Sequence, residues 1–150
     1  LLIPIVTIQS IALAHCQVPC GIYDDALRIV QIKEDFKTIR KAMDQIKLLS
    51  KKSDPLSINQ LNRWILTKEK HASNIQKTVS EYFLTQRVKA DKSQKYIDQT
   101  TTLHQVLVVA MKCKQTVDDS NVDRGIQLVD IFIGYYFDNH GVEHIKKLSE

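Results

Sequence analysis

Apolar side chains recur every three or four residues over four separate stretches of this chain, and few folds other than helical ones accept this spacing. In the first stretch the intervals are 3-4-3-4-3, which places the side chains on one face of an α-helix. The members of this stripe are Ile29, Ile32, Phe36, Ile39, Met43 and Ile46. We therefore predict a first amphipathic helix that ends near Ser50, followed by a loop over residues 51–55.

The second predicted helix begins at Ser57, which can form a capping box with Gln60. Lys68 falls on its apolar stripe, where we expect the stem to lie over the edge of the core and the ammonium to reach water. The apolar members of the stripe are Leu61, Ile65, Ala72, Ile75, Val79 and Tyr82.

A third helix is predicted over residues 95–117, with Leu103, Leu107 and Ala110 facing inward. Residues 118–121 form a polar turn. The fourth helix ends near residues 139–141, where Gly141 interrupts the pattern, and the tail 142–150 is long enough for a short turn of helix. Its stripe consists of Val122, Ile126, Val129, Ile133 and Tyr136.

Four helices of this length joined by short polar loops predict an all-α fold, an up-down-up-down four-helix bundle. No segment alternates as a half-buried strand does, and no Gly-rich loop suggests a phosphate site. The composition, 43% hydrophobic and 25% charged, is that of one globular domain with an adequate core. The net charge of +4 is scattered over the helices, so nucleic-acid binding is not indicated, although a small anion would be attracted.

The first 14 residues contain no charged side chain and end in Ala12-Leu13-Ala14, as a cleavable leader does. The segment is too short to span a bilayer, so we expect no membrane association of the mature form. A buried N-terminal element is disfavoured by Pro4 and by the change in polarity at His15. We therefore predict a leader over residues 1–14, a peptidase that cuts after Ala14, and a domain over residues 15–150.

The segment that follows this cut, residues 15–23, combines His15, Cys16 and Cys20 within six residues. Two thiolates and an imidazole at this spacing are typical metal ligands. Pro19 restricts the backbone and Gly21 permits a conformation that a side chain would block, so the segment can curl around one ion. We call residues 15–23 the predicted hook.

Cleavage before His15 would add a free α-amine, which can bind a metal near neutral pH. The amide nitrogen of Cys16 lies between this amine and the Cys16 sulfur and could close two chelate rings. An amine, an amide and two thiolates form a square plane, which suits nickel(II) or copper(II) better than zinc, and the His15 imidazole remains as an apical ligand. Alternatively, Cys16 and Cys20 form a disulfide in a non-catalytic secreted or organellar helical binding protein.

The pattern His15-Cys16-x-x-Pro19-Cys20-Gly21-x-Tyr23 resembles the metal-binding hook of the nickel superoxide dismutases, whose precursors are cut immediately before the histidine. That family folds as a small four-helix bundle. Looser similarities lie in the second helix, at Tyr82-Phe83, and in the third, at Leu103-His104-Gln105.

The resemblance implies conversion of superoxide to dioxygen and hydrogen peroxide by one nickel ion per chain, cycling between Ni(II) and Ni(III). It implies that His15 supplies amine and imidazole, Cys16 amide and thiolate, and Cys20 the second thiolate, while Tyr23 lines the substrate pocket. It also implies a homohexamer and a cytoplasmic location, whereas the apolar leader leaves an organelle or export open.

One feature of the family is not reproduced. A glutamate on the first helix and an arginine on the second hold the axial imidazole there, whereas counting from the hook places Gln31 at the glutamate position. Arg63 and His71 are both candidates for the arginine.

The remaining cysteine and histidines have simpler interpretations. Cys113 is expected to be an inert, partly buried thiol, and His71 and His104 to lie at the surface or the edge of the core. His140 and His144 could share a second metal only on a continuous helix, which Gly141 disfavours. The aromatic residues Phe132, Tyr135, Tyr136 and Phe137 are expected in the core or at a subunit interface.

Overall fold

The computed structural model describes residues 24–150, and within this range the chain is helical and contains no strand. The elements are α1 (Asp25–Leu49), α2 (Pro55–Lys77), the π-helix η1 (Thr78–Arg87), α3 (Gln94–Gln115), α4 (Ser120–Tyr136) and α5 (Asn139–Ser149). The predicted all-α class is confirmed. No helix in residues 24–150 is long and apolar enough to cross a membrane.

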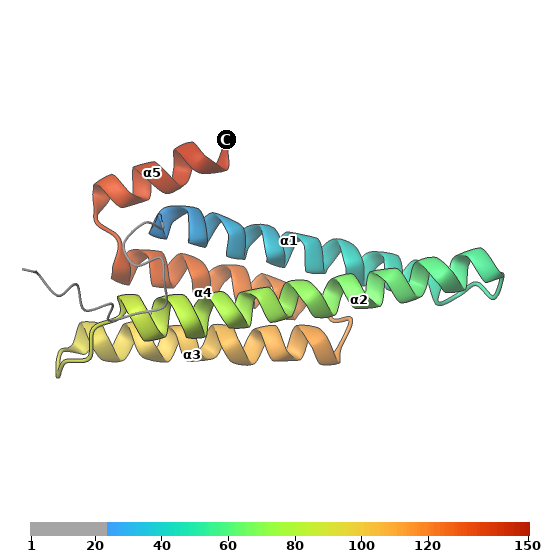
Figure 1. Ribbon diagram of the computed structural model, residues 1–150, viewed down its shortest axis with the longest axis horizontal. Helices are drawn as coiled ribbons and strands as arrows, with labels where there is room; N and C mark the ends of the chain where they lie inside the picture. The colour runs from blue at the N-terminus through green and yellow to red at the C-terminus, as the bar shows by residue number, and fades with distance from the viewer. Residues whose placement is uncertain (1–23) are drawn as a thin grey trace, which may run out of the picture.

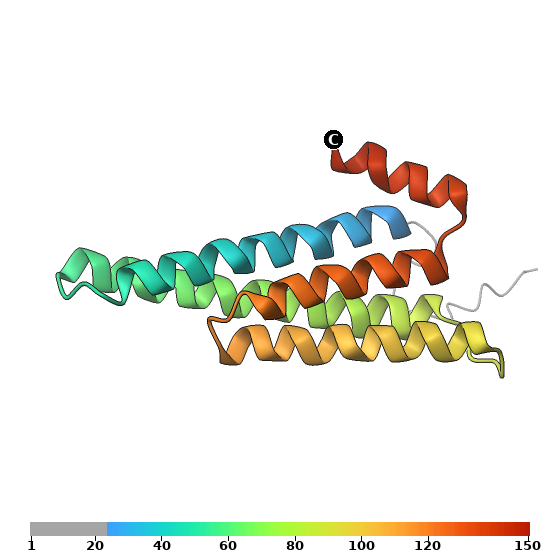
Figure 2. The same cartoon turned by 180° about the vertical axis from the view of Figure 1, so that it is seen from behind.

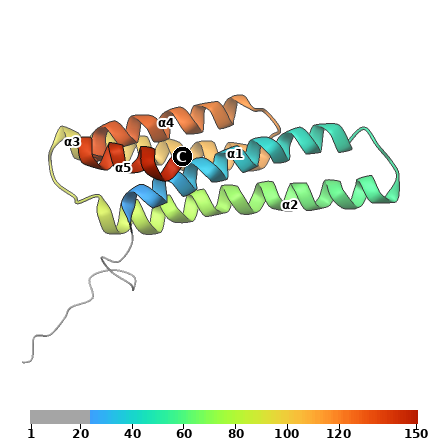
Figure 3. The ribbon, with the colours of Figure 1, turned by 90° about the horizontal axis from the view of Figure 1, so that it is seen from above.

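The long helices lie side by side and successive ones run in opposite directions (Figure 1). α1 packs against α2 and α4, and α3 packs against α4, α2 and η1. Seen from behind and from above, α1 and α2 reach beyond α3 and α4 at the end where their own connecting loop lies (Figures 2 and 3). α5 crosses the outer side of α1 near the N-terminal end of that helix.

The core forms along the predicted stripes. On α1, five of the six predicted positions are buried, and Ile46 is partly exposed. On α2 and η1 the stripe is buried from Ala72 to Tyr82, but Ile65 is exposed. Ile65 precedes this region in α2, whose first part lies beyond α3 and α4, so fewer neighbours are available to cover it.

The second helix begins earlier than the predicted capping box. Asp54 is its N-cap and accepts a hydrogen bond from the Ser57 amide at 2.9 Å, and Pro55 is the first helical residue. Aspartate is a strong N-cap, and proline fits the first helical position because its missing N–H would have no partner there. The Gln60 side chain instead accepts a hydrogen bond from Arg63, so the prediction of Ser57 as the cap is wrong.

The C-terminal tail forms α5, which is longer than the short turn predicted, and Gly141 lies inside it rather than ending a helix. Asp138 caps α5 by accepting from the Gly141 amide at 2.8 Å. A Cβ at Gly141 would lie 2.6 Å from Cδ1 of Phe137, so this position needs glycine because the aromatic ring approaches closely. The third and fourth helices end at Gln115 and Tyr136, a few residues before their predicted ends.

Two glycines of α4 provide a matched test of packing. A Cβ at Gly125 would overlap the Cε1 and Cζ atoms of the buried Phe36 ring, whereas at Gly134 no atom lies within 4 Å. We expect Gly125→Ala to lower the free energy of unfolding by about 1–3 kcal/mol. Gly134→Ala should raise it by about 0.5–1 kcal/mol, since alanine favours the helix. Urea denaturation followed by circular dichroism measures both, and equal effects would contradict the packing of Phe36 against α4.

Candidate metal centre

The predicted metal ligands His15, Cys16 and Cys20, and the predicted pocket residue Tyr23, lie outside the described residues. The description begins at Asp24, the residue that follows the predicted hook. What the structure defines is therefore the part of the helical domain that follows the predicted hook in the chain.

Asp24 is the N-cap of α1, and its side chain accepts hydrogen bonds from the Ala26 and Leu27 amides. Its Oδ2 atom lies 2.5 Å from Nε2 of His144 on α5. Burial acts to raise the pKa of Asp24, but the hydrogen bonds from His144 and the two amides outweigh it, so its pKa lies below the usual value. The first described residue is thus held by both α1 and α5.

Asp25, the next residue, joins three elements through its carboxylate. Its Oδ1 atom accepts a hydrogen bond from the Tyr82 hydroxyl of η1 and lies 2.9 Å from Nε of Arg87. Its Oδ2 atom accepts from the Tyr136 hydroxyl at the end of α4, at 2.7 Å. We call Asp25, Tyr82, Arg87 and Tyr136 the Asp25 cluster.

The π-helix brings two members of this cluster together. In η1 the backbone bonds reach five residues back, as in the 2.8 Å bond from the Val88 amide to the Phe83 carbonyl. Tyr82 and Arg87, which are five residues apart, consequently lie on the same side, and Nη2 of Arg87 donates to the Tyr82 hydroxyl at 2.9 Å. Arg87 also lies over the Tyr82 ring, 4.9 Å from its centroid.

The electrostatics of the cluster favour protonated tyrosine hydroxyls. Burial and the hydrogen bond to Asp25 raise the pKa of Tyr82, and the same two causes raise that of Tyr136. The hydrogen bond to Tyr82 raises the pKa of Arg87, which outweighs the opposite effect of burial. Both hydroxyls therefore remain donors to Asp25 at neutral pH.

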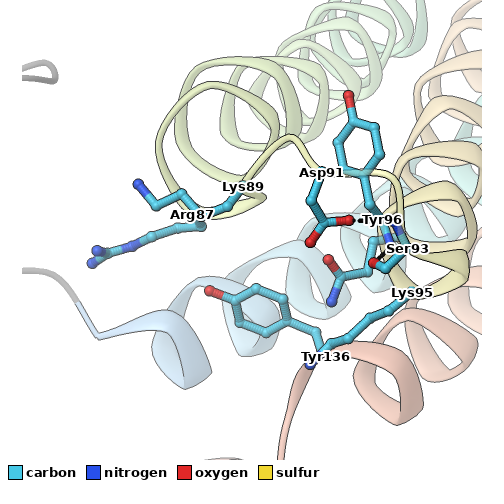
Figure 4. Close-up of a pocket in the computed structure, with 8 residues that line it drawn as sticks. Arg87, Lys89, Asp91, Ser93, Lys95, Tyr96 and Tyr136 are labelled. Atoms are coloured by element: carbon cyan, nitrogen blue, oxygen red, sulfur yellow. Dashed lines mark hydrogen bonds between the residues drawn. The ribbon is translucent and has the colours of Figure 1, made fainter.

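A cavity of about 230 Å³ opens beside the cluster (Figure 4). Tyr136 and Arg87 lie on one side of it, and the carboxylate of Asp91 accepts from the Ser93 amide on the other. Lys89, Lys95, Tyr96 and Gln99 complete its lining. A second cavity, of about 480 Å³, is lined by Asp25, Lys95, Tyr136, Phe137 and Asp138.

Gln31, Arg63 and His71, the residues considered as partners of the His15 imidazole, do not lie together in the structure. Gln31 on α1 accepts a hydrogen bond from Arg28 at 2.8 Å and shares a cavity with Asn74 and Thr78. Arg63 lies eleven residues before Asn74, about 16 Å along the helix, and therefore does not face Gln31.

His71, the other candidate, is paired with α1 one turn after Gln31. Its Nδ1 atom lies 2.5 Å from Oδ1 of Asp35. Burial raises the pKa of Asp35 despite this hydrogen bond. The structure therefore places His71 against Asp35, and no arginine of α2 takes the place opposite Gln31.

Among residues 24–150, no group of three or more histidine, cysteine or acidic side chains is placed so that it could hold a metal ion. His140 and His144 lie on one continuous helix, α5, despite Gly141 between them. His144 is paired with Asp24 rather than with His140. Cys113 is fully buried rather than partly buried as predicted, and burial raises its pKa to about 11, which disfavours the reactive thiolate.

The comparison with known families decides what kind of protein this is. The family model for nickel-containing superoxide dismutase matches residues 10–140, most of the chain. The chain belongs to this family. No curated protein and no solved structure gives a significant match.

As a nickel-containing superoxide dismutase, the protein is an oxidoreductase whose cofactor is nickel and whose substrate is superoxide. The resemblance drawn from the cysteines and the helical pattern is thereby confirmed. In this dismutase the Asp25 cluster could not be predicted from the sequence. Tyr82 and Tyr136, which donate to Asp25, follow it by 57 and 111 residues. No rule of sequence spacing relates residues so far apart, and no sequence pattern in residues 78–87 predicts a π-helix.

Proposed function

We propose that the mature dismutase begins at His15 and binds one nickel ion per chain within the predicted hook. The observation that carries this proposal concerns the thiols. The chain has three cysteines, and Cys113 is enclosed in the core with its pKa raised. Cys16 and Cys20 are then the thiols left to supply thiolates, and they lie inside the region matched by the family model.

The chemistry of the donors fits nickel. The α-amine and imidazole of His15, the amide of Cys16 and the thiolates of Cys16 and Cys20 would hold the ion, and such nitrogen and sulfur donors suit nickel(II). Bound there, nickel supplies one-electron redox chemistry by cycling between Ni(II) and Ni(III). Pro19 and Gly21 shape the chain around the ion, and Tyr23 orders the superoxide anion or the water that delivers a proton.

The wider architecture is part of the same proposal. The helices α1, α2 with η1, α3 and α4 form an up-down-up-down four-helix bundle, and the hook precedes α1. Removal of residues 1–14 by a peptidase activates the precursor, and the mature chains assemble as a homohexamer. Two superoxide ions and two protons give dioxygen and hydrogen peroxide. The alternative, a non-catalytic binding protein with a Cys16–Cys20 disulfide, is not favoured by the family.

The proposal is tested by comparing the chain that begins at His15 with the uncut chain. Each is given one equivalent of nickel, desalted, analysed for nickel and assayed for superoxide dismutation. We expect about one nickel per chain and activity only in the cut form, because only that form has the α-amine of His15. Equal activity in the uncut form, or a cut form that binds no nickel, would show that this ligand set is wrong.

A further inference from the structure

Asp25 occupies the first position of α1, yet its carboxylate does not cap that helix. Asp24 already does so by accepting from the Ala26 and Leu27 amides. The carboxylate of Asp25 is turned instead toward η1 and α4, where the other three members of the Asp25 cluster bond to it. Its role is therefore in tertiary structure rather than in helix initiation.

The Asp25 side chain makes strong contacts for a residue at the start of a helix. The side chains of Asp25 and Arg87 are about three-quarters buried, with 26% and 24% of their surface exposed. Both carboxylate oxygens are used, and two of the partners, Tyr82 and Arg87, also bond to each other. Hydrogen bonds that involve a charged partner are stronger than neutral ones. A closed network of such bonds stabilises a structure more than the same bonds made separately.

The position of Asp25 in the chain gives this network a consequence for the hook. Asp25 is two residues after Tyr23 and five after Cys20. A residue spans at most about 3.6 Å, so the Cα atom of Asp25 lies within about 18 Å of that of Cys20 and about 7 Å of that of Tyr23. Whatever fixes Asp25 therefore fixes the point from which the hook leaves the helical domain.

We propose that Asp25 is a positioning residue of the nickel centre, which anchors the base of the hook to η1 and α4 through Tyr82, Arg87 and Tyr136. This inference rests on the proposed function of the hook. A donor segment whose base is fixed loses less conformational freedom when it binds the ion, so the anchor raises nickel affinity without contributing a ligand. The hydrogen bond between Asp24 and His144 supports the same segment from α5.

The test uses the chain that begins at His15 and nickel alone as the probe. Asp25→Asn keeps the size of the side chain but removes the charge that pairs with Arg87. We expect its nickel affinity to fall several-fold, because the base of the donor segment is then held less firmly. We also expect the absorption spectrum of the bound nickel to change. Asp123→Asn is the matched control, because Asp123 also forms an ion pair, with Arg40, but on an exposed part of α4.

Two adjacent tyrosines give an independent comparison in case Asp25→Asn does not fold. Tyr136→Phe removes only the hydroxyl that donates to Asp25, whereas the neighbouring Tyr135 is 42% exposed and outside the Asp25 cluster. We expect Tyr136→Phe to weaken nickel binding several-fold with a spectral change, and Tyr135→Phe to leave both unchanged. Circular dichroism confirms that each variant retains its helices.

The outcomes separate the two proposals. If the unmodified chain binds nickel and Asp25→Asn and Tyr136→Phe bind it equally well with the same spectrum, the anchoring role of Asp25 is wrong and the nickel hook stands. If the unmodified chain beginning at His15 binds no nickel, the proposed ligand set is wrong and the anchor fails with it.

Discussion

Chains that begin at His15 and carry Cys16→Ser or Cys20→Ser are expected to bind no nickel in the redox-active form and to lose dismutase activity completely. A serine hydroxyl is not ionised near neutral pH and is a hard donor, whereas the proposed site requires soft thiolates to stabilise the higher oxidation state. The helical content should remain, because the core that the structure describes, from Ala26 to Ile145, includes neither cysteine. Nickel analysis, the dismutase assay and circular dichroism measure the three properties.

Cys113→Ser is the matched control for this experiment. Cys113 is fully buried on α3, so serine there should lower stability by about 1–3 kcal/mol through a poorly satisfied buried hydroxyl. Nickel content and activity should persist below the unfolding transition. If the Cys16 or Cys20 variant instead lost its helical structure, the cysteines would have a structural role, as in a disulfide.

Lys68→Met is expected to destabilise the helical domain by about 2–3 kcal/mol. The Lys68 ammonium does not reach water as the sequence suggested, since only 5% of the side chain is exposed. It donates to the carbonyl oxygens of Cys113, at 2.8 Å, and Lys114. These are two of the last four carbonyls of α3, which have no partner within the helix. Methionine retains the apolar stem but leaves both carbonyls without a donor.

The charge of Lys68 adds to this effect because a cation at the C-terminal end of a helix interacts favourably with the helix dipole. Lys70→Met, at an exposed position of the same helix, should change stability by less than about 0.5 kcal/mol. Urea denaturation with free energies from linear extrapolation distinguishes the two variants. If the Lys68→Met chain were as stable as the native one, the free energy lost by desolvating the ammonium would equal the free energy gained from its hydrogen bonds.

Part of the fold could be predicted from the spacing of apolar residues along the sequence. The stripe of α1 and its burial were predictable because the period of apolar residues and the period of the helix coincide. The prediction of Ser57 as the cap of α2 is wrong because Asp54 followed by Pro55, three residues earlier, is a stronger helix start than the Ser57–Gln60 pair. The prediction that Gly141 interrupts a helix is wrong because, in sequence, a glycine that accommodates the Phe137 ring cannot be told from one that ends a helix.

The sequence by itself determined the helical class, the family and the set of candidate metal ligands, because these depend on residues close together in the chain. His15, Cys16 and Cys20 fall within six positions, and each stripe repeats within a few turns. Only the tertiary structure decided which distant groups meet: Lys68 with the end of α3, and Asp25 with η1 and α4. Such contacts arise from how helices pack and from where a π-helix turns its side chains, and neither leaves a periodic trace in the sequence.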